Sequence, residues 1–402
     1  MDHASRLRWF VVAVVVLSSA LNYLDRQVLT ALAPAIRADF NLSNREYATI
    51  IAVFSICYAA ASPVMGLVID RLGVMNGAAF VVAFWSLANA ATGLVSTFGG
   101  LLLCRAALGT AEAGGIPATG KAFARYLEAK DRAVGTALNQ VGITVGSTAA
   151  PLLSVWAERS YGWPAAFVAS GALGIMWLPL WFAVARRASA LPEPVEVHDR
   201  GFRVLLRDRR LALLVAANAL SMTVYSLWFN WTTLFLVSEY RLPAAEVNQR
   251  YAWIPPVFAT AGGLFGGWLA RRLIRSGVAV LRARLRVGLI GAIAVVSTVA
   301  APLAPTPALA TAAICSGLFW VTCMSVNYYA LPLDLFGSAR AAFAVSCLTG
   351  SYGFMQAFLA PLIGDWSERY GWAAACWVIA VMPLASVAVL RPALNQVREA
   401  AA

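Results

Sequence analysis

The stretch Glu158-Arg159-Ser160-Tyr161-Gly162-Trp163 recurs in the second half of the sequence as Glu368-Arg369-Tyr370-Gly371-Trp372. A second pair of similar stretches, Gly66–Leu72 and Gly267–Leu273, is separated by a comparable distance along the chain. One such match can arise by chance, but two matches in register indicate an internal duplication. The sequence is therefore expected to fold as two related halves.

The composition places both halves in a membrane. Of the 402 residues, 60% are hydrophobic and only 12% are charged, whereas a soluble domain has about 25% charged residues. A membrane-spanning helix needs about 20 largely apolar residues, and twelve such stretches are present. They are Trp9–Ala33, Tyr47–Ile69, Gly77–Ser96, Gly99–Phe123, Ala133–Trp156, Trp163–Ala185, Leu211–Leu236, Ala252–Ala270, Val287–Ala304, Pro307–Tyr328, Ala341–Ile363 and Trp372–Leu390. We expect an all-α integral membrane protein with twelve transmembrane helices in two six-helix, pseudo-symmetric halves.

The longest break between expected spans lies near the middle of the chain and is basic, with prolines at positions 192 and 194. It predicts an N-terminal six-helix half at 1–187, a cytoplasmic central loop at 188–208 and a C-terminal six-helix half at 209–402. Two repeats of this kind are typical of carriers that work by alternating access.

The net charge of +12 is distributed as in a membrane protein, and no nucleic-acid partner is expected. With the N-terminus inside, most of the 31 Lys and Arg residues fall in cytoplasmic segments. This asymmetry is the positive-inside rule. It predicts a multi-pass protein of the cell inner membrane with both termini in the cytoplasm.

Four charged residues fall deep inside expected spans: Asp25 and Arg26 in the first, and Arg105 and Glu112 in the fourth, whereas Lys121 is expected at the cytoplasmic end of the fourth. A charge at the centre of a transmembrane helix costs at least about 2.5 kcal/mol, so such residues usually line a transport pathway or pair with one another. Neighbours on a helix point about 100° apart, so Asp25 and Arg26 are expected to face different surroundings. Arg105 and Glu112 are two turns apart and share a face.

The remaining chemistry-bearing residue types give no sign of an enzyme. The six cysteines lie in apolar stretches without metal-ligand or disulfide spacing, and buried cysteines of this kind behave as small hydrophobic residues. The sequence has no nucleophile–base pair, metal-ligand cluster or phosphate-binding loop. We expect no catalytic residue, no metal and no cofactor.

Several motifs resemble those of the major facilitator superfamily. The stretch Gly66-x-x-x-Asp70-Arg71-x-Gly73 is similar to the superfamily's first cytoplasmic loop, which acts as a gating loop. Asn22-Tyr23-Leu24-Asp25-Arg26 and Arg105-x-x-x-Gly109-x-x-Glu112 resemble its anion:cation symporter group, which includes bacterial sugar-acid (hexuronate) transporters. The chain departs from the pattern at Val74, Met75 and Asn76, where basic residues are usual, and at Arg271, where the second copy usually has an acid.

The resemblance implies a proton-coupled anion site. We expect Arg26 to bind the substrate carboxylate, because a guanidinium group binds a carboxylate through two parallel hydrogen bonds. Asp25 and Glu112 are the expected protonation sites, and Arg105 is expected to modulate Glu112. The alternative is that the four charges form static ion pairs that hold the first and fourth spans together.

Polar side chains in other spans are candidates for binding substrate hydroxyl groups. These are Tyr23, Tyr58, Asn139 and Gln140 in the first half, and Asn230, Asn327, Tyr328 and Gln356 in the second. The alternative for each is a hydrogen bond between helices. We expect the Gly142-x-x-x-Gly146 step to serve close helix packing, and Trp163 and Trp372 to be anchors at the membrane interface.

The leading hypothesis is a proton-coupled symporter that imports a small organic anion, such as a hexonate or hexuronate. The protein is expected to work as a monomer in the lipid bilayer, with protons and the anion as its partners. Two alternatives remain open. One is a proton-antiport exporter of an amphipathic or drug-like compound, and the other is a solute sensor that moves nothing.

Overall fold

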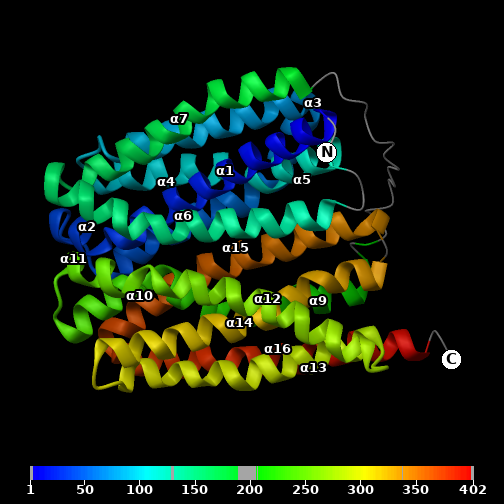
Figure 1. The fold of residues 1–402 in the computed structure, drawn as a ribbon. Coiled ribbons are helices and arrows are strands. Elements are labelled where there is room, and N and C mark those ends of the chain that lie inside the picture. The colour runs from blue at the N-terminus through cyan, green and yellow to red at the C-terminus, as the bar shows by residue number, and fades with distance from the viewer. Residues whose placement is uncertain (1–2, 128–130, 189–204, 206, 337, 400–402) are drawn as a thin grey trace. The chain divides into compact units, whose positions relative to one another are not determined.

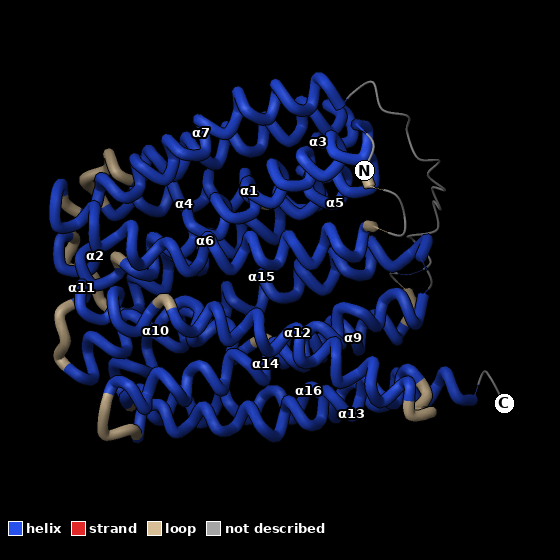
Figure 2. The backbone as a smooth tube through the Cα atoms, in the orientation of Figure 1, coloured by secondary structure: helices blue, strands red, loops and turns tan. Residues whose placement is uncertain are grey.

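The computed structural model describes residues 3–127, 131–188, 205, 207–336 and 338–399, and every regular element in these ranges is helical (Figures 1 and 2). The expectation of an all-α chain is confirmed. The first half contains α1 (His3–Ala31), α2 (Ala33–Asp39), α3 (Asn44–Thr92), α4 (Phe98–Glu112), α5 (Gly115–Tyr126), α6 (Arg132–Tyr161) and α7 (Trp163–Ala188). The second half contains α9 (Arg209–Ser221), α10 (Thr223–Tyr240), α11 (Ala244–Val247), η1 (Asn248–Ala252), α12 (Ile254–Arg275), α13 (Val280–Ala294), η2 (Val295–Leu303), α14 (Pro307–Phe336), α15 (Ser338–Arg369) and α16 (Gly371–Glu399).

All twelve expected spans fall on one helix or on consecutive helices. In eight places the helices of the described chain are long and apolar enough to cross a membrane. These are Arg6–Ala31, Arg71–Thr92, Trp163–Ala188, Arg209–Tyr240, Val280–Leu303, Pro307–Phe336, Phe343–Arg369 and Gly371–Pro392. The other four expected spans, in α3, α4–α5, α6 and α12, are also helical. Helix α4 has only 15 residues, because the chain breaks at Ala113 and Gly114 before α5 begins.

The chain forms two compact units. Unit 1 consists of Met1–Ser43, Thr49–Glu196 and Pro243–Trp253, and unit 2 consists of Asn44–Ala48, Val197–Leu242 and Ile254–Ala402. Most of each unit comes from one half of the sequence, and each unit takes one short segment from the other half. The predicted central loop at 188–208 lies almost entirely outside the described residues.

The duplicated motif has the same local structure in both units. Gly162 directly precedes α7 and Gly371 is the first residue of α16, and both have positive φ angles, of 84° and 78°, a conformation that favours glycine. The indole N–H of the following tryptophan then donates a hydrogen bond within its own unit. Trp163 bonds Asp39 Oδ2 at 3.0 Å, and Trp372 bonds Ser238 Oγ at 3.1 Å.

This arrangement corrects the expectation that the two tryptophans are interfacial anchors. The exposed fractions of Trp163 and Trp372 are only 8% and 7%. Each ring is packed inside its unit because its polar N–H finds a protein partner there, as buried indoles usually do.

Glycines allow close contact between α1 and α6, and this contact places the charged part of α1. A Cβ atom at Gly146 would lie 1.9 Å from the Ala20 carbonyl oxygen, and one at Gly142 would lie 2.7 Å from the Val16 carbonyl oxygen. The expected packing role of this glycine step is confirmed. In unit 2, Gly262 makes an equivalent approach from α12 to α14.

Candidate functional site

The centre of the candidate site is an ion pair between α1 and α4. Arg26 Nε donates a hydrogen bond to Glu112 Oε2 at 2.5 Å. The side chain of Glu112 is fully buried and that of Arg26 is 18% exposed. Helix α4 ends at Glu112, and Ala113 and Gly114 separate it from α5. The acid therefore lies at a break in the fourth span, followed directly by the glycines that loosen that helix.

Three aromatic rings surround the guanidinium group of Arg26. Its Cζ lies 4.7 Å from the ring centre of Tyr58, 5.1 Å from that of Tyr23 and 5.2 Å from that of Phe54. These distances are within the range of cation–π attraction. The ring faces hold the cation in a partly desolvated position. The bond to Glu112 uses only Nε, so the two terminal nitrogens lie outside that bond.

Asp25 has separate surroundings, as the helical geometry predicts. It is fully buried, and its Oδ1 accepts a hydrogen bond from Asn89 Nδ2 at 2.8 Å. The same amide donates to Ser170 Oγ at 2.7 Å. This cluster joins α1, α3 and α7. Its polar groups stabilise a carboxyl group that would otherwise be very costly to bury.

Arg105 lies inside unit 1 with an exposed fraction of 1%. Its Cζ is 5.2 Å from the centre of the Phe167 ring. The Arg105 charge acts electrostatically on both Asp25 and Glu112. The four intramembrane charges therefore belong to one neighbourhood in unit 1, with two acids balanced by two bases.

Each buried acid retains one unused oxygen. Asp25 Oδ2 and Glu112 Oε1 have no hydrogen-bond partner among the described residues. A carboxylate oxygen is an acceptor only, whereas a protonated carboxyl group carries one donor. An unbonded oxygen on each acid is a position that can take a proton without breaking an existing hydrogen bond.

The other expected site residues have varied surroundings. In unit 1, Asn139 Oδ1 is buried without a described partner, and Gln140 is exposed on α6. In unit 2, Asn230 is half-buried and donates to the Ser226 carbonyl oxygen at 2.8 Å. Gln356 is buried, with 8% exposed.

Asn327 and Tyr328 form hydrogen bonds within unit 2. Asn327 donates to the Gly266 carbonyl oxygen of α12 at 3.2 Å and accepts from Arg284 of α13 at 3.2 Å. Tyr328 and Ser386 of α16 share a hydrogen bond of 3.1 Å. Both side chains thus link helices of unit 2.

In the expected gating loop, Gly73 interrupts α3 with a φ of 73°. A Cβ atom at Gly66 would meet no neighbour within 4 Å. Arg71 is exposed, and the Asp70 side chain lies outside the described ones.

Sequence reasoning missed four residues of this neighbourhood. Phe54 and Phe167 lie against the two arginines, and Asn89 and Ser170 bond near Asp25. The two phenylalanines could not be recognised from the sequence, because the chain contains many other aromatic residues in its apolar stretches. Asn89 could have been noticed, because it is an isolated polar amide in an apolar span.

Comparison with known proteins agrees with this architecture. The model of the Major Facilitator Superfamily matches residues 15–346. The hexuronate transporter of Escherichia coli (strain K12) is 29% identical, over 98% of this chain and 96% of its own length. The galacturonate transporter of Dickeya chrysanthemi is 32% identical, over 65% of this chain and 81% of its own length.

The fold is also found among solved structures. A bacterial homologue of the human lysosomal transporter Spinster, in an inward-facing and occupied conformation, superimposes with a TM-score of 0.77. It is 19% identical and covers 96% of this chain and 97% of its own chain. The helical membrane fold, the internal duplication and the family match over most of the length lead to one conclusion. The chain belongs to the major facilitator superfamily, and it is a multi-pass membrane transporter, not an enzyme.

Proposed function

We propose that this protein is a proton-coupled symporter that imports a sugar acid, such as a hexonate or hexuronate, by alternating access. The observation that carries the proposal is the Arg26–Glu112 ion pair inside an aromatic cage. The names of the two relatives described above support a sugar acid as the substrate. The distribution of Lys and Arg supports a location in the inner membrane, with both termini in the cytoplasm.

The anion is proposed to bind at Arg26. The cage of Tyr23, Phe54 and Tyr58 desolvates one side of the guanidinium group and fixes its plane. A substrate carboxylate can then accept two hydrogen bonds from the terminal nitrogens, which the bond to Glu112 does not use. Arginine suits this role better than lysine because its planar group matches the geometry of a carboxylate.

Proton coupling follows from competition for Arg26. Glu112 is stable as a buried anion because Arg26 compensates its charge. When a second carboxylate binds Arg26, this compensation is divided between two anions, and a buried charge without full compensation is costly. Protonation of Glu112 removes that cost, so binding of anion and proton become linked. Asp25 is the second proposed proton site, and Arg105 adjusts both acids.

Movement is proposed to involve the loop of Gly66, Asp70, Arg71 and Gly73. Gly73 provides a break with positive φ between the second and third spans, which lets their relative angle change without unwinding either helix. The polar residues Asn139, Gln140, Asn230 and Gln356 remain candidates for contacts with substrate hydroxyl groups.

The test is uptake of labelled galacturonate and related sugar acids into proteoliposomes, with and without an inward proton gradient. We expect accumulation driven by the gradient in the wild type and in Arg159→Ala, which removes an exposed arginine, and none in Arg26→Ala. Folding is checked by size-exclusion chromatography. Absence of uptake of every acid by folded wild-type protein would refute the substrate assignment. Gradient-driven efflux of an amphipathic compound would then favour the exporter.

A further inference from the structure

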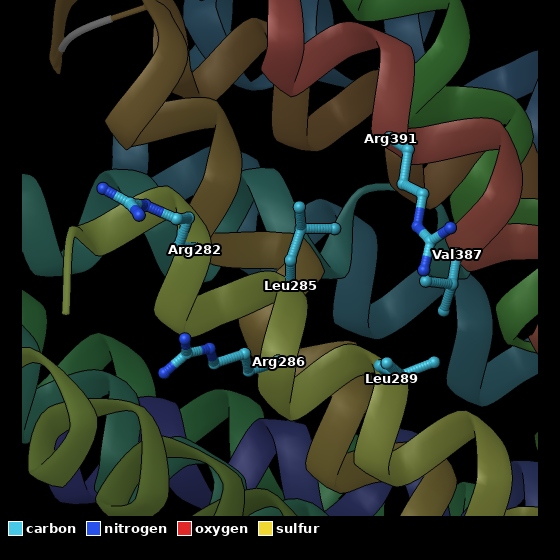
Figure 3. A pocket seen from close by; sticks show the side chains of 6 residues that line it. All are labelled: Arg282, Leu285, Arg286, Leu289, Val387 and Arg391. Atoms are coloured by element: carbon cyan, nitrogen blue, oxygen red, sulfur yellow. The ribbon is translucent and has the colours of Figure 1, made fainter. Parts of the chain in front are cut away.

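Three arginines lie beside a shallow groove in unit 2 that the proposed transport cycle does not use. Arg282 and Arg286 belong to the first two turns of α13, and Arg391 lies near the C-terminal end of α16. The groove has a volume of about 200 Å³, and its other lining residues are Leu285, Leu289 and Val387. Figure 3 shows Leu285 between Arg282 and Arg391, with Leu289 below Val387, while the side chains of Arg282 and Arg286 point away from Arg391.

The arginines lie at the ends of two spans. The apolar segments run from Val280 to Leu303 and from Gly371 to Pro392. Arg282 therefore follows the start of one segment, and Arg391 precedes the end of the other. Positions at span ends are at the level of lipid headgroups, where long basic side chains reach the polar region.

Among the residues that the structure describes, no acid pairs with any of these three charges. None of the three arginines forms an ion pair with a described residue, and all three are exposed. Arg284, on the same helix, is different. Its Nε bonds Asp334 Oδ2 at 2.5 Å and its Nη1 bonds Asn327. Arg284 thus stabilises the interior of unit 2, whereas Arg282 and Arg286 present their charge outward.

The groove continues into an apolar surface on the side away from the arginines. Leu289 lies one turn beyond Leu285 on α13, and Val387 lies one turn deeper than Arg391 on α16. Val387 itself is buried, with 4% exposed, but Leu384, one turn beyond it, is 37% exposed, and Ile293, one turn beyond Leu289, is 60% exposed. Exposed apolar side chains along a transmembrane helix are typical of a surface that contacts lipid chains. The surface therefore combines a cationic end with an apolar strip.

We propose that this groove binds an anionic phospholipid, with the headgroup among Arg282, Arg286 and Arg391 and one acyl chain along Leu285, Leu289 and Ile293. Charge complementarity selects an anion, since basic residues at the membrane surface attract anionic headgroups. The apolar strip favours a lipid over a soluble phosphate, because a hydrocarbon chain can pack against these apolar side chains and a phosphate ion cannot. A lipid bound here bridges α13 and α16.

The test is native mass spectrometry of the purified transporter with phosphatidylglycerol. The triple variant Arg282→Gln, Arg286→Gln, Arg391→Gln is compared with the control Arg207→Gln, Arg209→Gln, Arg275→Gln, which removes three exposed arginines elsewhere. We expect the wild type and the control to retain one phosphatidylglycerol that the triple variant binds at least about tenfold more weakly. Equal retention by all three proteins would overturn the proposal.

Two further arms identify the ligand and guard against a folding defect. Glycerol 3-phosphate and inorganic phosphate are tested as competitors, and neither is expected to displace the lipid at equal concentration. Displacement by either would show that the groove binds phosphate alone. In the wild type, a photoactivatable phosphatidylglycerol is expected to crosslink to peptides of α13 and α16, and crosslinks confined to other helices would contradict the proposal.

Discussion

Glu112 accepts a hydrogen bond from Arg26 at 2.5 Å through Oε2, while its Oε1 has no partner among the described residues. The same carboxylate thus compensates a cation with one oxygen and leaves the other unused. A purely structural pair would gain from hydrogen bonds to both oxygens, since an unsatisfied buried acceptor costs about 1–3 kcal/mol. Under the proposed function, this unused oxygen is the position that takes the proton during transport.

Glu112→Gln is expected to abolish accumulation driven by a proton gradient and to leave substrate exchange partly intact. The amide has nearly the same shape and cannot take up a proton, so binding and reorientation persist without coupling. Accumulation and counterflow are measured in proteoliposomes that contain equal amounts of protein. Equal loss of both activities in a folded variant would instead indicate that Glu112 holds α1 and α4 together.

Tyr58→Ala is expected to raise KM for the anion by about 2-fold to 30-fold, because a cation–π contact contributes about 0.5–2 kcal/mol. Tyr58→Phe keeps the ring face over Arg26 and is the matched control, with KM expected close to that of the wild type. A large effect of Tyr58→Phe would show that the hydroxyl group, and not the ring, matters for binding.

The sequence predicted the fold and the charged centre because both depend on local composition. Long apolar stretches define the spans, and only four charges fall deep inside them, so Asp25, Arg26, Arg105 and Glu112 stand out in the sequence alone. The separation of Asp25 from Arg26 by about 100° follows from helix geometry, and their separate partners, Asn89 and Glu112, agree with it.

The sequence did not predict contacts between distant helices. Phe54 resembles many other phenylalanines in the chain until α1 and α3 are brought together. Trp163 and Trp372 were expected at the lipid interface because tryptophan is common there, yet each finds a hydrogen-bond partner inside its own unit. Such pairings depend on helix packing, which hydropathy does not describe.

Gly146→Ala is expected to destabilise unit 1 by about 1–3 kcal/mol, the usual cost of adding a methyl group to a closely packed contact. The new Cβ would lie 1.9 Å from the Ala20 carbonyl oxygen, so α1 and α6 must separate. The melting temperature is measured by fluorescence-detected size exclusion. Gly263→Ala, in a helix position with no neighbour within 4 Å, is expected to cause no loss, and an equal loss in both variants would argue against close packing as the cause.

Asp208→Asn is expected to lower the melting temperature near neutral pH, by an amount that shrinks under acidic conditions. Asp208 precedes α9, and its carboxylate accepts hydrogen bonds from the Arg210 backbone N–H at 2.8 Å and from Arg210 Nη2 at 2.7 Å. The side-chain bonds to Arg210 lower the pKa of Asp208 below its usual value. A carboxyl group whose pKa is lowered by folding stabilises the protein above its unfolded pKa, about 3.9 for aspartate, and this contribution is lost as the pH falls through the folded pKa.

Because asparagine keeps the cap acceptor, the difference in melting temperature between wild type and variant isolates the charge. Nano-scale differential scanning fluorimetry from pH 7 to pH 3 measures this difference, and a gap that stays constant across the range would assign the effect to the shape of the cap instead of its ionisation.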